Sequence, residues 1–245
     1  MLDLSINHGV AEVVINRPKA RNALSPELLE ALISRCEALS SDPSTRVVLL
    51  RGAHGHFSGG ADLQAFASRI YAEGEALADL GHRAINAISA LPQITIAHIE
   101  GVCVGGGFVL AGACELRLAA PNARFALPEL MAGIPVAWGG MSTLHRILGE
   151  ARLLDLVLSG RKVDAEEALR IGLISRYADL DEARASARQV ASYPRSTLRT
   201  IKRQIQGLRD GTFQGIDDAQ SLLQALRDPE VLACMQAYMS STFKS

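Results

Sequence analysis

The chain has 245 residues, of which 48% are hydrophobic, and a formal net charge of −1 from 25 basic and 26 acidic side chains. It is long enough to bury a full-sized core, and its evenly spread charges exclude the basic stripe or cluster that nucleic acid or an anionic membrane requires, so we expect neither partner. The first twenty residues do not resemble a signal peptide and the four cysteines form no CxxC pair, so we expect a cytoplasmic protein without a metal site.

The first part of the chain alternates strand-like and helix-like segments. The β-branched run 11–16 predicts a strand. In the segment 25–39, Ser25 suits a helix N-cap, Pro26 suits the first helical position, and apolar residues recur at helical spacing. The continuous apolar run 46–52 then predicts a strand that is buried on both faces.

The alternation continues through the middle of the chain. We expect a helical region from about 63 to 90 and a strand over 93–101. Three consecutive glycines, 105–107, follow that strand and open the next helix. The segment 115–129 predicts two short strands around a Pro-Asn turn, so the elements together indicate an α/β fold.

The pattern changes after about residue 140 and becomes mostly helical, with one last short strand expected over 173–175. The amphipathic run 196–208 is typical of a helix that packs on a core or on a neighbouring subunit. The sequence therefore predicts an α/β core over 1–185 and a helical segment over 186–245 for packing and oligomerisation.

Two glycine-rich stretches, 56–63 and 101–108, each follow a strand and precede a helix. Neither matches the P-loop, the dinucleotide fingerprint or the GxSxG nucleophile elbow. Two interpretations stay open from the residues alone. The glycines permit tight packing of strand against helix, or two backbone N–H groups converge on one carbonyl oxygen and stabilise an enolate.

Several segments in one order carry a resemblance to a known family. They are "NRPKARNALSPELLEAL", "FSGGADL", "IEGVCVGGGFVLAGACEL", "FALPELMAGIPVAWGG" and "LSGRKVDAEEALRIGLIS". Together they resemble the enoyl-CoA hydratase/isomerase family, the crotonase superfamily, over roughly residues 10 to 180. The resemblance implies a spiral of ββα repeats with a helical C-terminal region, assembled as a homotrimer or hexamer. It also implies an acyl-CoA thioester as ligand, with CoA entering as part of the substrate and no separate cofactor.

The resemblance assigns roles to particular residues. It implies that Gly59 and Gly106 donate their N–H groups to the thioester oxygen. The turn that borders the CoA would consist of Gly60, Ala61 and Asp62. An early CoA-contacting loop would supply Lys19, Ala20, Asn22, Ala23 and Leu24.

The catalytic carboxylates of the family indicate which reaction a member performs. Hydratases of the family carry two catalytic glutamates, but here the first position is Val109 and only the second, Glu129, remains. The position at which dienoyl isomerases place an aspartate is Ala137, and Trp138 replaces a small residue and would narrow or line the acyl pocket. One base is sufficient for a 1,3-proton shift, so the resemblance favours an isomerase that converts 3-enoyl-CoA to 2-enoyl-CoA with Glu129 as single acid/base.

An apolar pocket would raise the pKa of Glu129 toward neutrality, and the expected walls are Val109, Leu127, Leu130 and Trp138. Three alternatives stay open: a weakly active hydratase, a divergent thioester decarboxylase or hydrolase, and a catalytically silent acyl-CoA binding protein. Glu129 as an ordinary surface glutamate that caps a helix is the plain structural alternative.

Other chemistry-bearing residues favour structural roles. We expect Glu115 to be a structural acid, His54 and His56 to lie in a solvated turn, and the cysteines to be core residues; the two near the glycines are Cys103 and Cys114. Lys202 and Arg203 are expected on a solvated helix face, although a contact to CoA phosphates is an alternative.

Overall fold

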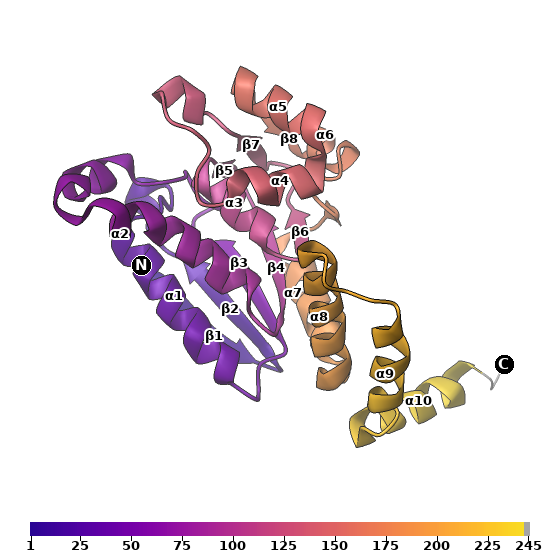
Figure 1. Ribbon diagram of the computed structural model, residues 1–245. Helices are drawn as coiled ribbons and strands as arrows, with labels where there is room; N and C mark the ends of the chain where they lie inside the picture. The colour runs from indigo at the N-terminus through magenta and orange to yellow at the C-terminus, as the bar shows by residue number, and fades with distance from the viewer. Residues whose placement is uncertain (243–245) are drawn as a thin grey trace.

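The structure, a computed structural model, describes residues 1–242 of the chain. Within these residues the larger sheet has six strands in the order β1-β2-β3-β4-β6-β9 (Figure 1). β1 and β2 form an antiparallel hairpin, and the other neighbouring pairs of this sheet are parallel. The strands span Leu2–Asn7 (β1), Val10–Ile15 (β2), Val47–Gly52 (β3), Ile94–Ile99 (β4), Leu116–Ala119 (β6) and Arg176–Tyr177 (β9).

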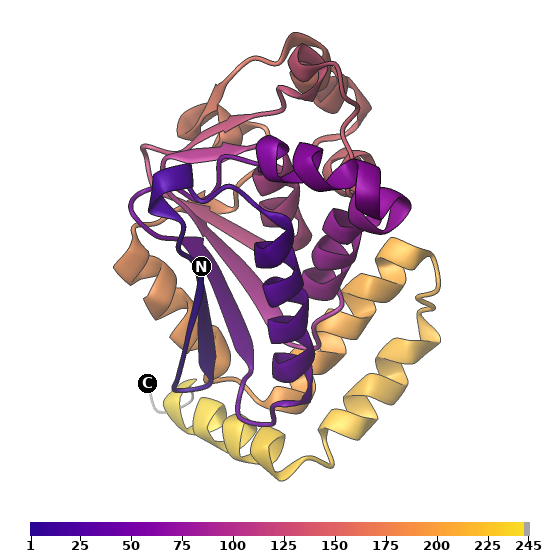
Figure 2. The ribbon, with the colours of Figure 1, turned by 90° about the vertical axis from the view of Figure 1, so that its left-hand side faces the viewer.

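Helices cover both faces of this sheet (Figures 1 and 2). Because successive side chains of a strand point to opposite faces, Val48 and Leu50 of β3 join the core beneath α1 and α2, whereas Val47 and Leu49 join the core beneath α7 and α8. These four helices span Pro26–Ser41 (α1), Leu63–Ser89 (α2), Leu180–Ala191 (α7) and Arg195–Asp210 (α8).

A smaller sheet of three strands, in the order β5-β7-β8, lies beyond the end of β4 within the described chain. Short helices surround it. The strands span Val102–Val104 (β5), Arg124–Ala126 (β7) and Val163–Asp164 (β8), and the helices span Gly106–Ala113 (α3), Gly140–Leu148 (α4), Glu150–Ser159 (α5) and Ala165–Arg170 (α6). Two 3-10 helices, Pro18–Ala20 (η1) and Glu129–Ala132 (η2), flank the sheet ends.

The last two helices, α9 (Ile216–Ala225) and α10 (Pro229–Thr242), extend beyond the sheet on the side of α8 (Figure 1). Their large apolar side chains are mostly exposed, including Leu222, Leu223 and Tyr238. No helix among residues 1–242 has the length and apolar character that crossing a bilayer demands.

The α/β fold with a helical C-terminal region is confirmed, and the elements expected over 11–16, 25–39, 46–52 and 93–101 are present. The prediction of a strand over 173–175 is wrong. Leu173 and Ile174 are buried as their apolar character required, but they lie in a turn, and the strand β9 begins only at Arg176, directly after the expected range. The expected division at 185/186 falls inside α7, whose alanines pack on the sheet, so the helical segment has no break there.

Strand β1 was not expected because its side chains are mostly exposed and give no continuous apolar run. It is held by the two-residue turn His8–Gly9, in which both residues have positive φ, 51° and 76°. This geometry is that of the type I′ turns that favour hairpins. β1 therefore closes the sheet edge through this turn, together with the partly buried side chains of Leu2 and Leu4, which pack against the core.

Candidate active site

The candidate site lies where the loops after β3 and β4 meet. The carboxyl ends of parallel strands lie at one edge of a sheet, which is where ligands bind in open α/β folds. The two loops are joined by backbone bonds: Phe57 donates to the Glu100 carbonyl at 2.9 Å, and Val104 donates to the Ser58 carbonyl at 3.0 Å. Leu24 donates to the Gly60 carbonyl at 2.8 Å and so adds the loop before α1.

Two backbone N–H groups remain unpaired at this junction. Ala61 and Gly106 both line the same cavity, and neither N–H has a hydrogen-bond partner within residues 1–242. Gly106 is the first residue of α3, so its N–H is one of those that a helix start leaves free. Together they place two backbone N–H groups without a partner in the described chain at residues that line one cavity.

The structure corrects the expectation that Gly59 donates its N–H to the thioester oxygen. Its N–H donates to the Arg21 carbonyl at 2.9 Å, so this group is already occupied in the structure. The following Gly60 adopts φ +95°, which side chains rarely tolerate, and a Cβ there would lie 2.9 Å from the Val104 carbonyl oxygen. The glycine pair thus shapes the turn, and the next residue, Ala61, presents the free N–H.

Glu129 is the first residue of η2, and its carboxylate lies close to Gly105, the N-cap of α3. A Cβ placed on Gly105 would lie 2.9 Å from Glu129 Oε1, so the glycine makes room for the acid. Oε2 is buried and has no hydrogen-bond partner within the described residues. Burial raises the pKa of Glu129, partly opposed by a hydrogen bond from its own backbone N–H. The side chain is half-buried, so Glu129 is less solvated than an ordinary surface glutamate.

The cavity between these groups has a volume of about 320 Å³. Apart from Glu129, its walls are apolar side chains and small residues. The lining is Ala61, Leu63, Phe66, Ile70, Ala78, Gly106, Val109, Glu129, Ile134, Pro135, Ala137 and Trp138. Two expected walls are wrong: Leu127 is fully buried in the core, and Leu130 is exposed and does not line the cavity.

Val109 lies in the buried face of α3 and closes one side of the cavity. Its Cγ2 is close to Gly140, where an added Cβ would lie 2.6 Å away, and Val136 approaches the same point at 2.7 Å. The position that resembles the first glutamate of the hydratases is therefore filled by tight apolar packing.

The loop Lys19–Leu24 divides into buried and accessible residues. Asn22 is buried, and its side chain donates to the carbonyls of Ala53 and His56 at 2.8 and 2.7 Å. Leu24 is fully buried, whereas Lys19 is exposed and Ala20 and Ala23 are half-buried. Asn22 and Leu24 thus fix the loop to the site rather than facing a ligand.

Sequence reasoning missed Arg17. Its guanidinium pairs with Asp62 at 2.9 Å and also donates to the Ala23 carbonyl. Asp62 in turn accepts from the Ala65 N–H at 3.2 Å and caps α2. The first arginine of "NRPKARN", two residues after the end of β2, was the available signal. This ion pair ties the expected CoA loop to the turn that carries Ala61.

Comparison with known proteins identifies the family of this chain. The family model described as enoyl-CoA hydratase/isomerase matches residues 5–239.

The chain belongs to the enoyl-CoA hydratase/isomerase family.

It is 34% identical over 184 residues to the short-chain-enoyl-CoA hydratase of Clostridium acetobutylicum, covering 75% of this chain and 70% of that protein. It is 34% identical over 200 residues to the protein named "Probable enoyl-CoA hydratase echA8" of Mycobacterium tuberculosis, covering 79% of this chain and 76% of that one. Among solved structures, an enoyl-CoA hydratase/carnithine racemase from Magnetospirillum magneticum superposes with a TM-score of 0.91 at 30% identity, covering 98% of this chain and 92% of that one.

Several remaining candidates of this family member have structural roles. His54 is exposed, His56 Nδ1 accepts from the Val102 N–H at 3.3 Å, and the described residues hold no group of three or more possible metal ligands. Cys103 and Cys114 are buried core residues, and burial raises the pKa of both thiols, that of Cys114 to about 12.

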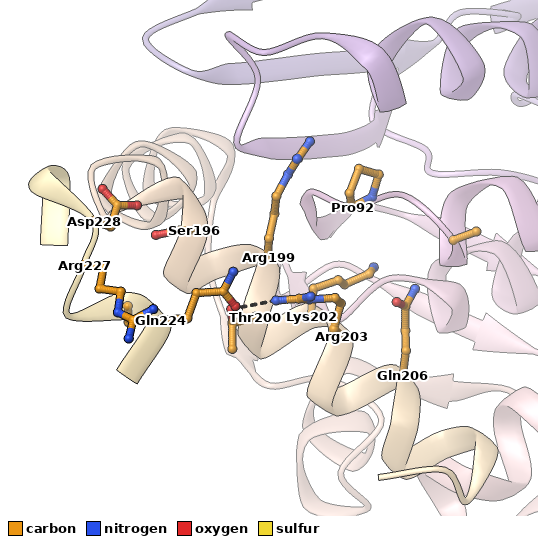
Figure 3. A pocket seen from close by; sticks show the side chains of 12 residues that line it. Pro92, Ser196, Arg199, Thr200, Lys202, Arg203, Gln206, Gln224, Arg227 and Asp228 are labelled. Carbon is orange, nitrogen blue, oxygen red and sulfur yellow. Dashed lines mark hydrogen bonds between the residues drawn. The ribbon is translucent and has the colours of Figure 1, made fainter. Parts of the chain in front are cut away.

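Lys202 corrects the expectation of a solvated helix face. It is 1% exposed and pairs with Glu115 at 2.6 Å, so Glu115 is confirmed as a structural acid. Arg203 is exposed and instead lines a different cavity, between α8 and α9, where it donates to Thr200 at 3.2 Å (Figure 3). That cavity also contacts Pro92, just before β4, at the end of the sheet opposite the acid Glu129.

Proposed function

We propose that this enzyme shifts the double bond of a 3-enoyl-CoA to give 2-enoyl-CoA, with Glu129 as the single acid/base. The observation that carries the proposal is the composition of the cavity. It holds one carboxylate, whose pKa is raised and whose Oε2 lacks a partner within the described chain, beside a packed valine at position 109. One base of this kind suits removal and return of a proton better than the addition of water.

The proposed reaction starts with the thioester oxygen accepting hydrogen bonds from the Ala61 and Gly106 N–H groups. Glu129 removes a proton from C2, and the electron pair forms a C1–C2 double bond as negative charge moves to the thioester oxygen. The resulting dienolate takes the proton back from Glu129 at C4, and the double bond settles between C2 and C3. Two preorganised donors stabilise the intermediate, and loss of one such donor costs about 3 kcal/mol of barrier.

The raised pKa of Glu129 fits this role because the group must both accept and return a proton near neutrality. General acids and bases work best when their pKa lies close to the operating pH. Burial in the apolar cavity raises the pKa of Glu129, which is the direction that this role requires. For CoA, we place the contacts on Lys19, Ala20 and Ala23, which are accessible, together with the turn Gly60–Asp62.

Enoyl-CoA hydratase activity is the second candidate. It is supported by the names of the relatives, among them the short-chain-enoyl-CoA hydratase of Clostridium acetobutylicum. A hydratase with Glu129 alone would position water with one carboxylate, so we expect it to be slow. Decarboxylation or hydrolysis of a thioester and silent acyl-CoA binding are outcomes that the same experiment distinguishes.

The deciding experiment is an absorbance assay for conjugated product with purified protein and 3-enoyl-CoA esters of several chain lengths. Under the proposal 2-enoyl-CoA forms, and Glu129→Gln lowers kcat by at least about a hundredfold while ester binding stays unchanged. Glu75→Gln, an exposed glutamate outside the cavity lining, is the matched control and should keep full activity. Faster hydration of 2-enoyl-CoA than isomerisation would favour the hydratase. Binding with no turnover would favour a silent binder, and release of free CoA or carbon dioxide the other thioester reactions.

We further propose a cytoplasmic homotrimer or hexamer that needs no cofactor beyond the CoA of its substrate. The exposed apolar side chains of Leu208, Leu222 and Leu223, each about 60% exposed, support assembly through α8 and α9. Light scattering of the purified chain tests this, and a monomer at micromolar concentration would contradict it.

A further inference from the structure

Trp138 occupies the cavity in an unusual backbone conformation. Its φ is +59°, in the left-handed region that large side chains rarely adopt. Such strain persists only where the surroundings hold the residue, and it gathers at ligand sites. A glycine at this position would have no such strain, as the next residue, Gly139, illustrates with φ +73°. The indole is therefore kept at an energetic cost.

Two glycines on facing helices leave a slot for this ring. A Cβ on Gly81 of α2 would overlap the Trp138 indole, and so would a Cβ on Gly106 of α3. Phe66, also on α2, lies beside the indole, and the centroids of the Phe66 and Trp138 rings are 5.9 Å apart. The indole thus fills the gap between α2 and α3 directly beside the free N–H of Gly106.

The indole leaves only a small space for an acyl chain. The cavity of about 320 Å³ lies at the lower end of the range of roughly 300–1,000 Å³ for small-molecule pockets. Its remaining wall on α2 consists of Leu63, Phe66, Ile70 and Ala78. An acyl group whose carbonyl oxygen meets the Gly106 N–H would meet the indole before it could pass between the two helices.

We infer that Trp138 sets the length of the acyl group and restricts the enzyme to short-chain thioesters, from butanoyl to about hexanoyl. This inference rests on the proposed acyl-CoA function of the same site. Trp138 is a specificity-determining residue here, because it blocks the volume that additional methylene groups would occupy. Its ring is half-buried and lines the cavity, unlike the fully buried aromatic residues Phe108 and Phe125 of the core.

The test is direct binding of unreactive saturated esters, which separates pocket size from catalysis. Calorimetry would give the Kd of butanoyl-, hexanoyl-, octanoyl- and decanoyl-CoA for the parent protein and for Trp138→Gly. The glycine removes the ring and suits the positive φ, so the variant is expected to fold. The parent should gain no affinity beyond hexanoyl-CoA, whereas Trp138→Gly should gain about fourfold for each further methylene that becomes buried.

Two further variants make the result interpretable. Met141→Ala shortens a side chain three residues away that does not line the cavity, and it should keep the parental chain-length profile. Gly81→Ala should displace the indole and disturb binding of every ester, and combining it with Trp138→Gly should restore binding because the overlap is then removed.

The outcomes distinguish the proposed acyl-CoA function from the inference about Trp138. If the parent protein binds none of the esters, the proposed acyl-CoA function itself is wrong. If it binds them, and folded Trp138→Gly shows the same chain-length profile, the inference about Trp138 is overturned while the proposed function stands. A parent that binds decanoyl-CoA more tightly than hexanoyl-CoA also overturns it.

Discussion

Lys202 Nζ lies 2.6 Å from Glu115 Oε2, and the two side chains are only 1% and 10% exposed. The pair joins α8 to the segment that follows α3. Arg209, also on α8, approaches the other carboxylate oxygen at 3.2 Å, and the Thr95 hydroxyl donates to Oε2 at 2.8 Å. This buried network fastens the first helix of the C-terminal tail to the strand β4 and to the far end of the helix that carries Gly106.

Loss of one partner from this network should destabilise the protein strongly. Lys202→Met keeps much of the apolar stem but leaves Glu115 buried with less charge compensation, which typically costs about 3 kcal/mol. Urea unfolding of the variant should show this loss. Arg203→Met, the neighbouring exposed position, is the control and should change the free energy of unfolding by less than about 0.5 kcal/mol. Equal effects at both positions would mean that the pair contributes little.

Lys202 also shows why the sequence could not predict this contact. A lysine on an amphipathic helix is usually solvated, and the acid it meets lies 87 positions earlier in the chain, which no local pattern reveals. The major strands and helices of the core were predictable because apolar runs, an N-cap at Ser25 and glycine-rich turns act over short distances. The strand β9 was expected three residues too early, because burial of Leu173 and Ile174 does not require a strand.

The segments that form the candidate site were predictable from the sequence, but the hydrogen bonds of their individual residues were not. The spacing of "SGGAD" marked the correct turn, yet only the structure shows that the Gly59 N–H donates to the Arg21 carbonyl while the Ala61 N–H has no partner within residues 1–242. In the same way, the resemblance placed Asn22 in the CoA-contacting loop. Its hydrogen bonds to the Ala53 and His56 carbonyls depend on the tertiary structure and could not be predicted.

Substitution by alanine should have different effects at the neighbouring positions Gly59 and Gly60. Gly60→Ala places a Cβ 2.9 Å from the Val104 carbonyl oxygen at φ +95°, so we expect a loss of about 1–3 kcal/mol in unfolding free energy. It should also lower kcat because the Ala61 N–H shifts. Gly59→Ala meets its nearest atom, the Arg21 carbonyl oxygen, at 3.4 Å and should be tolerated with activity largely kept. Denaturation curves and the isomerase assay check both, and greater harm from Gly59→Ala than from Gly60→Ala would contradict the steric difference between the two positions.

The raised pKa of Glu129 predicts a pH dependence of stability. The folded protein holds this proton more tightly than the unfolded chain, whose pKa is near the ordinary value of 4.5. The resulting stabilisation is fully present below pH 4.5 and is lost as pH rises through the raised pKa. Glu129→Gln lacks this titration, so it should gain stability relative to the parent protein across that window. Urea unfolding at a series of pH values measures the difference, and a difference that is constant with pH would show that the carboxyl is not shifted.

Position 109 should control the balance between isomerisation and hydration. Val109→Glu adds a second carboxylate to the cavity, and we expect faster hydration of 2-enoyl-CoA because two acids can then position water and deliver a proton. The change buries a charge beside Val136 and Gly140, where packing is tight, so a stability loss of about 1–3 kcal/mol should accompany it.

The isosteric control for this test is Val109→Thr, which adds a hydroxyl without a carboxylate and should leave hydration at the parental rate. Hydration and isomerisation rates of the three proteins, measured side by side with the same short-chain ester, give the comparison. Because Val109 and Val136 both lie close to Gly140, the double variant Val109→Glu/Val136→Ala removes bulk near the longer side chain. If neither glutamate variant hydrates 2-enoyl-CoA faster than Val109→Thr while both remain folded, position 109 does not govern the choice between the two reactions.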